Sequence, residues 1–288
     1  MHRYKKEKMS LKRYLISDLK SKKELSSLDG DFLSDLADNY FVKNKKLFSI
    51  IEEHPKFEKS REYKITLKDL RKILHEIYGV FQLDHNREKL LGLLEKEIIN
   101  KDKIDDEVLD LHKKILKTHR STKERLDDYR NIYKKILDKD VRFILDIGSG
   151  LNVFSFPFMG LKKVDYIAAE LNAKDCLFLD RYFDLMKKFG LNGKSIKINL
   201  LKDRRFPEVD VVFLFKVLDT LESLERGITK EILDSIKCRK LVVSFPTNTL
   251  SGKNLSKKRL IWFEKLIKNY ETFETGNEIF YIIKEKDF

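Results

Sequence analysis

A carboxylate and two glycines follow an apolar run in the segment RFILDIGSG, residues 142–150. The spacing of Asp146, Gly148 and Gly150 is typical of a strand that ends in a tight turn, where glycine lets the backbone approach a ligand. The dinucleotide fingerprint G-x-G-x-x-G requires a third glycine, but Val153 stands at that position. An acid at the end of the strand suits a ligand that carries positive charge and hydroxyl groups. S-adenosyl-L-methionine is such a ligand.

A second acid, Glu170, ends the next apolar segment, DYIAAE. A carboxylate at the end of the second strand can accept hydrogen bonds from both hydroxyls of a ribose. After the third predicted strand, Asn199 is suited to bond the amino edge of an adenine, and Leu200 to pack on its ring. These features together favour a methyltransferase. A nucleotide-binding fold without enzymatic activity is the alternative, because a fold alone does not determine function.

The elements that position these residues alternate between strand and helix after residue 140, which predicts an α/β fold with a largely parallel, doubly wound sheet. We predict strands at residues 142–146, 164–169, 195–199, 209–215, 240–245 and 279–283. We predict helices between them at residues 175–189, 217–224, 230–236 and 257–268.

Residues 1 to about 118 have a different pattern. Apolar residues recur at spacings of three and four, as in TLKDLRKILHEIYGVF, which predicts helices. The segment TKERLDDYRNIYKKILD, residues 122–138, is predicted to be one helix that joins the two halves. We therefore expect an all-helical domain over residues 1–118 and a second domain over residues 119–288.

The 288-residue chain is strongly basic, with 60 Lys and Arg, 47 Asp and Glu, and a net charge of +13. This surplus favours nucleic acid as the partner, and an acidic membrane surface second, although a Lys- and Glu-rich surface is an alternative. The basic start of the chain is either a nucleic-acid contact or a solvated tail. We find no signal peptide and no apolar run of the ~20 residues that span a membrane. The two cysteines form neither a disulfide framework nor a zinc site. We expect a soluble, cytoplasmic monomer without a metal.

Six segments of the chain resemble one family of enzymes. In chain order they are HRSTKERL, ILDIGSGLNVFSFPFMGL, DVVFLFKVLDTLE, VSFPTNTLSGK, WFE and GNEIFYI. They resemble the aminoglycoside-resistance 16S rRNA methyltransferases, which methylate N7 of a guanine in the ribosomal decoding site. The resemblance runs from about residue 65 to the end. It implies a class I S-adenosylmethionine-dependent methyltransferase (Rossmann-like) domain, preceded by a helical domain that binds the small (30S) ribosomal subunit.

The resemblance also implies roles for single residues. Arg125 would pair with the methionine carboxylate of the cofactor. The residues implied to contact the cofactor are Phe81, His119, Arg120, Ser121, Arg125, Asp146, Gly148, Gly150, Glu170, Asn199, Leu200 and Phe215. Lys216 and Arg204 would face the RNA. Two positions depart from the family pattern, because Asn199 replaces an aspartate of some members and Asp219 replaces the usual proline.

The chemistry of guanine N7 indicates what the site must do. N7 has a lone pair and no proton to lose, so no general base is needed, and catalysis comes from placing N7 ~3 Å from the methyl carbon. Phe245 or Phe156 is expected to stack on a guanine that has been flipped out of its helix, whereas Phe154 and Phe158 are expected in the core. We expect Phe245 and Lys216 to carry the catalytic role.

Phosphate contacts are expected from the helical domain and from Lys202, Arg204 and Arg205, so affinity for RNA should fall steeply with salt. Two further functions stay open. One is methyl transfer to another RNA or base, such as N1 of an adenine. The other is binding of RNA or cofactor without transfer.

Overall fold

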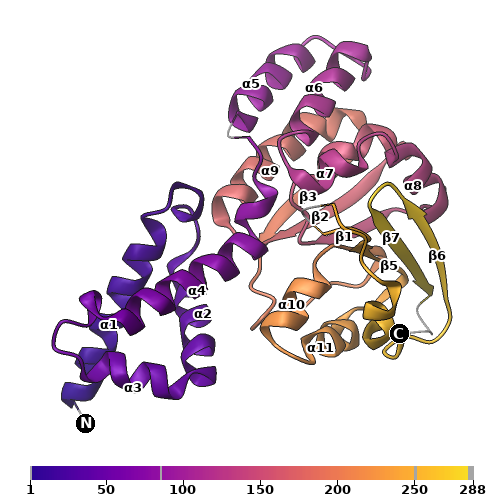
Figure 1. Cartoon of the computed structure of the whole chain (residues 1–288). Coiled ribbons are helices and arrows are strands. Elements are labelled where there is room, and N and C mark those ends of the chain that lie inside the picture. The colour runs from indigo at the N-terminus through magenta and orange to yellow at the C-terminus, as the bar shows by residue number, and fades with distance from the viewer. Residues whose placement is uncertain (1, 85, 250–251, 285–288) are drawn as a thin grey trace. The chain divides into compact units, whose positions relative to one another are not determined.

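The computed structural model describes residues 2–84, 86–249 and 252–284 (Figure 1). The chain forms two compact units, Met1–Gln82 and Leu83–Phe288. In the described residues, no helix is both long and apolar enough to cross a membrane.

The first unit is helical, as the sequence predicts. Its α-helices are α1 (His2–Lys20), α2 (Gly30–Lys43), α3 (Lys45–Glu53) and α4 (Arg61–Ile77), and short 3-10 helices lie at Lys23–Leu25, Phe57–Lys59 and Gly79–Phe81. Asp29 caps α2 and Ser60 caps α4, each by accepting a hydrogen bond from a backbone N–H of the first turn. Asp18 joins α1 to α4, because its carboxylate accepts from Tyr63 Oη at 2.7 Å and its carbonyl accepts from Arg71.

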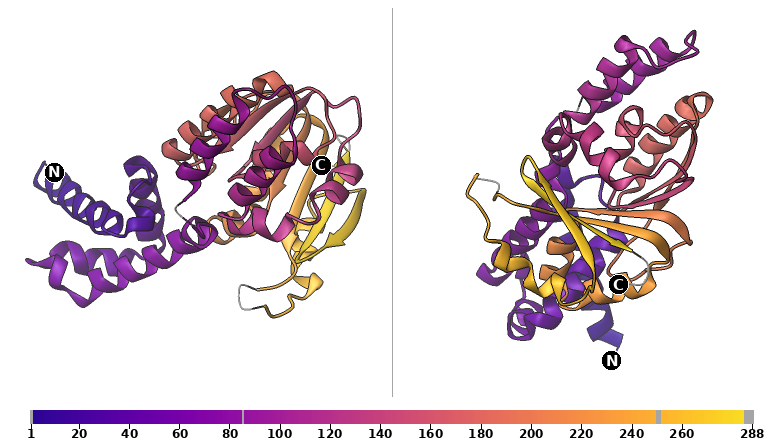
Figure 2. Two further views of the ribbon diagram at one scale, coloured as in Figure 1. Left: turned by 90° about the horizontal axis from the view of Figure 1, so that it is seen from above. Right: turned by 90° about the vertical axis from the view of Figure 1, so that its right-hand side faces the viewer.

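The second unit contains a seven-stranded sheet in the order β3-β2-β1-β4-β5-β7-β6 (Figure 2). Its strands are β1 (Phe143–Ile147), β2 (Val164–Glu170), β3 (Leu191–Lys197), β4 (Val209–Phe215), β5 (Cys238–Pro246), β6 (Tyr270–Thr275) and β7 (Glu278–Lys284). The first five strands in this order are parallel, and β7 runs antiparallel to both of its neighbours. The predicted doubly wound α/β fold is confirmed. The strand order reverses between β1 and β4, and ligands bind at such a point, beyond the carboxyl ends of the strands.

Helices cover both faces of this sheet (Figures 1 and 2). The α-helices of the second unit are α5 (Arg87–Ile98), α6 (Asp106–Leu116), α7 (Arg120–Arg125), α8 (Tyr129–Ile136), α9 (Ala173–Met186), α10 (Leu218–Leu224), α11 (Ile228–Ser235) and α12 (Ile261–Glu264). Short 3-10 helices lie at Asn152–Phe158, Lys187–Phe189 and Lys257–Leu260.

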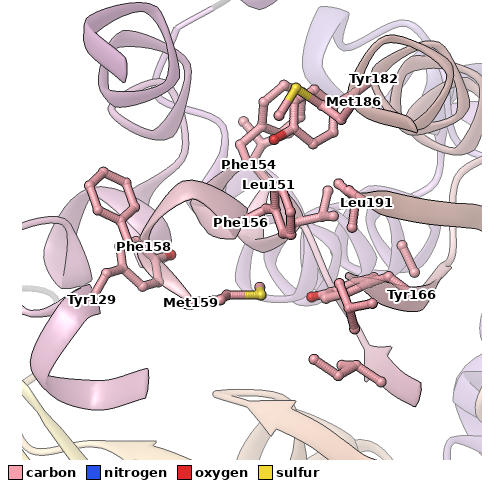
Figure 3. Close-up of a cluster of buried hydrophobic side chains, with 14 of the residues drawn as sticks. Tyr129, Leu151, Phe154, Phe156, Phe158, Met159, Tyr166, Tyr182, Met186 and Leu191 are labelled. Carbon is pink, nitrogen blue, oxygen red and sulfur yellow. The ribbon is translucent and has the colours of Figure 1, made fainter. Parts of the chain in front are cut away.

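Successive side chains of each strand point to opposite faces, so the sheet separates two buried clusters. Ile144 and Phe213 belong to the first cluster, and Leu145 belongs to the second. In the first cluster the ring of Phe154 stacks on Tyr182 with centroids 3.9 Å apart (Figure 3). Phe154 and Phe158 are both buried there, which confirms their predicted place in the core.

The compact units divide at Gln82, not at the boundary near residue 118 expected from the helical pattern. The reason is that α5 and α6 bury their apolar faces in the first cluster beside the sheet. Leu91, Leu94, Val108 and Ile115 all lie in this cluster together with Ile144 of β1.

Some elements differ from those predicted. Residues 122–138 form two helices, because the chain turns through Leu126–Asp128 with i→i+3 hydrogen bonds. Strand β3 begins earlier than expected, and the segment 257–268 contains only a 3-10 turn and the short α12. Strand β6 was not predicted. It is a largely exposed edge strand that carries charged residues, so its sequence, YETFET, lacks an apolar run.

Candidate cofactor and substrate site

The glycine turn after β1 is as tight as its sequence predicts. Gly148 and Gly150 have φ angles of 69° and 54°, in the left-handed region that favours glycine. A Cβ atom on Gly148 would lie 2.6 Å from Cγ2 of Val217, and one on Gly150 would lie 2.9 Å from the ring of His119. The N–H of Gly148 donates to the carbonyl of Ala169 at 2.9 Å, which fixes the turn against the end of β2.

Asp146 lies behind this turn and is only 1% exposed. Its Oδ2 accepts hydrogen bonds from Asn152 Nδ2 at 2.9 Å and from the Tyr166 hydroxyl at 2.5 Å. Burial raises the pKa of Asp146, and these hydrogen bonds oppose the rise. The carboxylate holds these neighbouring side chains in place, and its direct contact with the cofactor stays a prediction. Sequence reasoning missed Asn152 and Tyr166, which are not marked by any local pattern.

Asn152 connects Asp146 to Arg125. Its Oδ1 accepts from Arg125 Nη1 at 3.4 Å and from the Tyr129 hydroxyl at 3.0 Å. Arg125 is 3% exposed, and it also donates from Nε to the Ser121 carbonyl at 3.2 Å and from Nη2 to the Ser121 hydroxyl. A guanidinium has five N–H donors. Bonds to the described residues use three of them, so two remain that can bind a carboxylate.

Glu170 ends β2 on the other side of the glycine turn. Its Oε1 accepts a hydrogen bond from the N–H of Gly150, and its Oε2 accepts from the N–H of Leu171 at 3.3 Å. Burial raises the pKa of Glu170 to about 8, and repulsion from Asp175 adds to the rise. Asp175 is itself paired with Arg87 at the start of α5. Burial therefore favours the protonated form of the Glu170 carboxyl group.

His119, Arg120 and Ser121 lie at the start of α7, beside the turn. His119 is 9% exposed, and burial lowers its pKa to about 3, with further lowering by the charge of Arg125. The imidazole is therefore neutral at physiological pH. Ser121 is buried as a partner of Arg125, whereas Arg120 is half-buried. The structure thus brings Arg125, His119 and Ser121 together around the glycine turn.

Phe215 ends β4 at the same edge of the sheet, and Lys216 follows it. The guanidinium carbon of Arg125 lies 4.9 Å from the centroid of the Phe215 ring. Lys216 has a φ of 60°, a strained value for a residue with a side chain. Its Nζ lies 2.6 Å from Glu124 Oε2 and 3.2 Å from Glu278 Oε2.

The lysine side chain is only 7% exposed. Lys216 is therefore enclosed by two carboxylates and does not lie on an open surface, and its contact with RNA stays a prediction. Sequence reasoning missed Glu278, because nothing local to the segment GNEIFYI indicates that it lies beside β4.

The structure places Phe245 away from this site, which corrects the expectation that it stacks on a base. It is fully buried in the second cluster, where its ring packs edge-on against Trp262, Phe263 and Tyr281. Phe156 is also buried, at 4% exposure, in the first cluster (Figure 3). Neither ring is accessible to a nucleotide in this arrangement.

The remaining predicted residues lie further along the chain or in the first unit. Asn199 and Leu200 are half-buried after β3, and Asn199 Oδ1 accepts from the N–H of Leu201 at 3.1 Å. Phe81 belongs to the first unit and is not part of the site built from the second, so its cofactor contact stays a prediction.

The three basic residues predicted to contact phosphate differ in their solvent exposure. Lys202 and Arg205 are exposed, and Arg205 pairs with Asp203 at 3.0 Å. Arg204 is half-buried and pairs with Glu231 at 3.0 Å.

Comparison with known proteins identifies the family. A protein named 16S rRNA (guanine(1405)-N(7))-methyltransferase from Micromonospora echinospora is 29% identical over 230 residues, 76% of this chain and 82% of its own. One of the same name from Proteus mirabilis is 25% identical over 234 residues, 75% of this chain and 83% of its own.

The crystal structure of the 16S rRNA methyltransferase RmtF in complex with S-adenosyl-L-homocysteine has the same fold. Its TM-score is 0.70 at 23% identity, over 95% of this chain and 98% of that one. Residues 58–267 match the family model described as ribosomal RNA methyltransferase (FmrO). The chain therefore belongs to the FmrO family of ribosomal RNA methyltransferases.

Proposed function

We propose that the protein methylates N7 of a guanine in the decoding site of 16S rRNA, within the 30S subunit, with S-adenosyl-L-methionine as the methyl donor. The observation that carries this proposal is the placement of Arg125 and Glu170. They flank the glycine turn at the point where the strand order reverses, in a chain of the rRNA methyltransferase family. The similar proteins from Micromonospora and Proteus are named for this modification.

The residues of the site fit this cofactor. Arg125 keeps two N–H donors, which can bind the methionine carboxylate. The carboxyl group of Glu170 can bond the ribose hydroxyls, and the absence of a side chain on Gly148 lets the backbone lie close to the nucleoside. We assign Asn199 and Leu200 to contacts with the adenine of the cofactor. His119 and Ser121 are assigned to its methionine part. Phe215, whose ring lies against Arg125, is also assigned to the cofactor. When bound, the cofactor supplies a methyl group on a sulfonium sulfur.

The protein's own task is to position the two reactants. Guanine N7 loses no proton during the transfer, so the site needs no residue that acts as a base. This agrees with His119, because its low pKa makes the imidazole a weak base. Positive charge passes from the sulfur to the purine, so carboxylates or carbonyl groups close to the base would assist the transfer.

The net charge of +13 supports an RNA partner. We assign phosphate contacts to the helical first unit and to Lys202, Arg204 and Arg205, with Lys216 nearer to the target base. With 16S rRNA as the proposed substrate, we expect the enzyme to act in the cytoplasm and as a monomer. Methylation of the decoding site would protect its host against aminoglycosides.

Labelled S-adenosyl-L-methionine tests the reaction. Purified 30S subunits should become labelled, and borohydride–aniline treatment should cleave the 16S rRNA at the modified guanine. Mass spectrometry of the nucleosides separates guanine N7 from adenine N1 and other positions. Label that enters naked RNA or protein but not 30S subunits would contradict the assigned target. Expression in a sensitive bacterium should confer resistance to kanamycin and gentamicin.

A further inference from the structure

The carboxylate of Glu278 lies between the two cations of the site. Strand β7 begins at this residue and pairs antiparallel with β5, so Glu278 stands opposite Pro246 at the edge where the parallel strands end. The side chain is buried, and its Oε1 accepts a hydrogen bond from the Ser244 hydroxyl. Its Oε2 lies 3.2 Å from Lys216 Nζ and 3.6 Å from Arg125 Nε.

Stability alone does not explain this carboxylate. Among the described residues, no donor meets Glu278 Oε2 in hydrogen-bond geometry, although that oxygen is buried. A buried ion pair is weak evidence for stability, because apolar residues of similar volume often serve the fold as well. The residues that follow, Ile279 and Phe280, are apolar and buried. A charge at the first position of β7 therefore points to a role in the site.

The strained backbone of Lys216 indicates what that role is. A side-chain residue with a φ of 60° persists only where its surroundings hold it. Glu124, the other carboxylate beside the ammonium, is 31% exposed and stands on the short helix α7. Glu278 is 2% exposed by its side chain and is fixed by the sheet and by Ser244. It is the rigid one of the two partners of Lys216.

We propose that Glu278 is a positioning residue for methyl transfer, which holds the ammonium of Lys216 at a fixed place beside the Arg125 end of the cofactor site. This inference rests on the proposed function. Arg125 is also held by hydrogen bonds to Ser121 and Asn152 in which Glu278 takes no part. Loss of the Glu278 charge therefore affects the transfer step more than cofactor binding.

Glu278→Gln tests the proposal, because it keeps the shape and a partner for Ser244 while it removes the charge. We expect kcat for 30S methylation to fall about 10- to 100-fold, as displacement of a positioning group by ~1 Å can do. The Kd for S-adenosyl-L-homocysteine should stay within about threefold. Glu274→Gln is the matched control, because Glu274 is an exposed carboxylate of the same hairpin that also pairs with a lysine, Lys257. This variant should match the wild type.

A second readout does not depend on turnover. Acetic anhydride modifies accessible amines, and mass spectrometry reports the rate at each lysine. Lys216 should react slowly in the wild type and in Glu274→Gln, and faster in Glu278→Gln. Ser244→Ala, which removes only the hydrogen bond to Oε1, should shift both readouts in the same direction by less. It provides the test if Glu278→Gln does not fold.

The outcomes separate the two proposals. Equal kcat and equal Lys216 labelling in Glu278→Gln and Glu274→Gln would overturn the positioning role. A parallel loss of kcat and cofactor affinity would also overturn it, because that pattern indicates a general disturbance of the site. If the wild type does not methylate 30S subunits, the proposed function fails. The labelling rates then decide separately whether Glu278 holds Lys216.

Discussion

Replacement of Arg125 by lysine should weaken cofactor binding without unfolding the protein. The guanidinium donates to Ser121 and Asn152 and keeps two N–H groups for a carboxylate. Lysine keeps the charge but lacks the planar fork that binds a carboxylate through two parallel bonds. Alanine would be a poorer choice. It removes a cation from the buried Glu278, which can cost about 3–5 kcal/mol and would mix folding with binding.

The expected magnitude follows from the loss of one of the two bonds to the methionine carboxylate. A hydrogen bond to a charged group contributes about 1.5–3 kcal/mol. Since about 1.4 kcal/mol is a factor of ten, the Kd for S-adenosyl-L-homocysteine should rise about 10- to 100-fold.

Isothermal titration calorimetry measures this Kd, and thermal unfolding without cofactor checks that the variant is folded. Arg130→Lys is the control, because Arg130 is an exposed arginine of α8 whose guanidinium carbon lies 5.6 Å from the ring of Phe158. If Arg125→Lys binds the cofactor as tightly as Arg130→Lys does, the assignment of Arg125 to the methionine carboxylate is wrong.

Three further predictions concern the fold around the site. Burial raises the pKa of Glu170 from 4.5 to about 8 in the folded protein, so between these values the folded state binds more protons than the unfolded state and stability falls as pH rises. Glu170 changes the free energy of unfolding by at most about 1.4 kcal/mol per pH unit. Urea unfolding at pH 5.5 and 7.5 should show a smaller decrease in this free energy for Glu170→Gln than for the wild type. Gly148→Ala adds a Cβ at positive φ against Val217, so urea unfolding should show a free energy of unfolding lower by about 1–3 kcal/mol. Adding Val217→Ala should restore part of this loss. An unchanged free energy of unfolding would mean that the turn is looser than described. Phe245→Leu should lower stability by about 1–2 kcal/mol and leave kcat per folded molecule unchanged, whereas a large fall in kcat would restore Phe245 to the substrate site.

The glycine turn and the acid at the end of β2 could be predicted because their signals are local. Gly148 and Gly150 are required by a turn that the sequence shows directly. Glu170 ends an apolar segment that the alternation of strands and helices predicts to be the second strand. Asp146 was predicted at the end of β1 and lies one residue before it, but its partners come from elsewhere in the chain. Only the folded structure shows that the side-chain amide of Asn152 donates a hydrogen bond to Asp146 and accepts one from Arg125.

The surroundings of Phe245 and Glu278 could not be predicted as well, because they depend on which strands are neighbours. Phe245 and Ser244 are adjacent in sequence but point to opposite faces of β5, and the face that each occupies is set by the register of the sheet. Glu278 reaches the site only because β7 inserts antiparallel beside β5. A charged residue at the start of a predicted strand does not reveal this pairing.

The two backbone contacts of Glu170 have a consequence for ligand binding. Its carboxyl oxygens accept from the N–H groups of Gly150 and Leu171, and each oxygen has a further lone pair. Under the proposed function, a ribose hydroxyl would therefore bond the carboxyl group without breaking these contacts. The backbone already holds the acid in one orientation, so little free energy would be lost in ordering this side chain on binding.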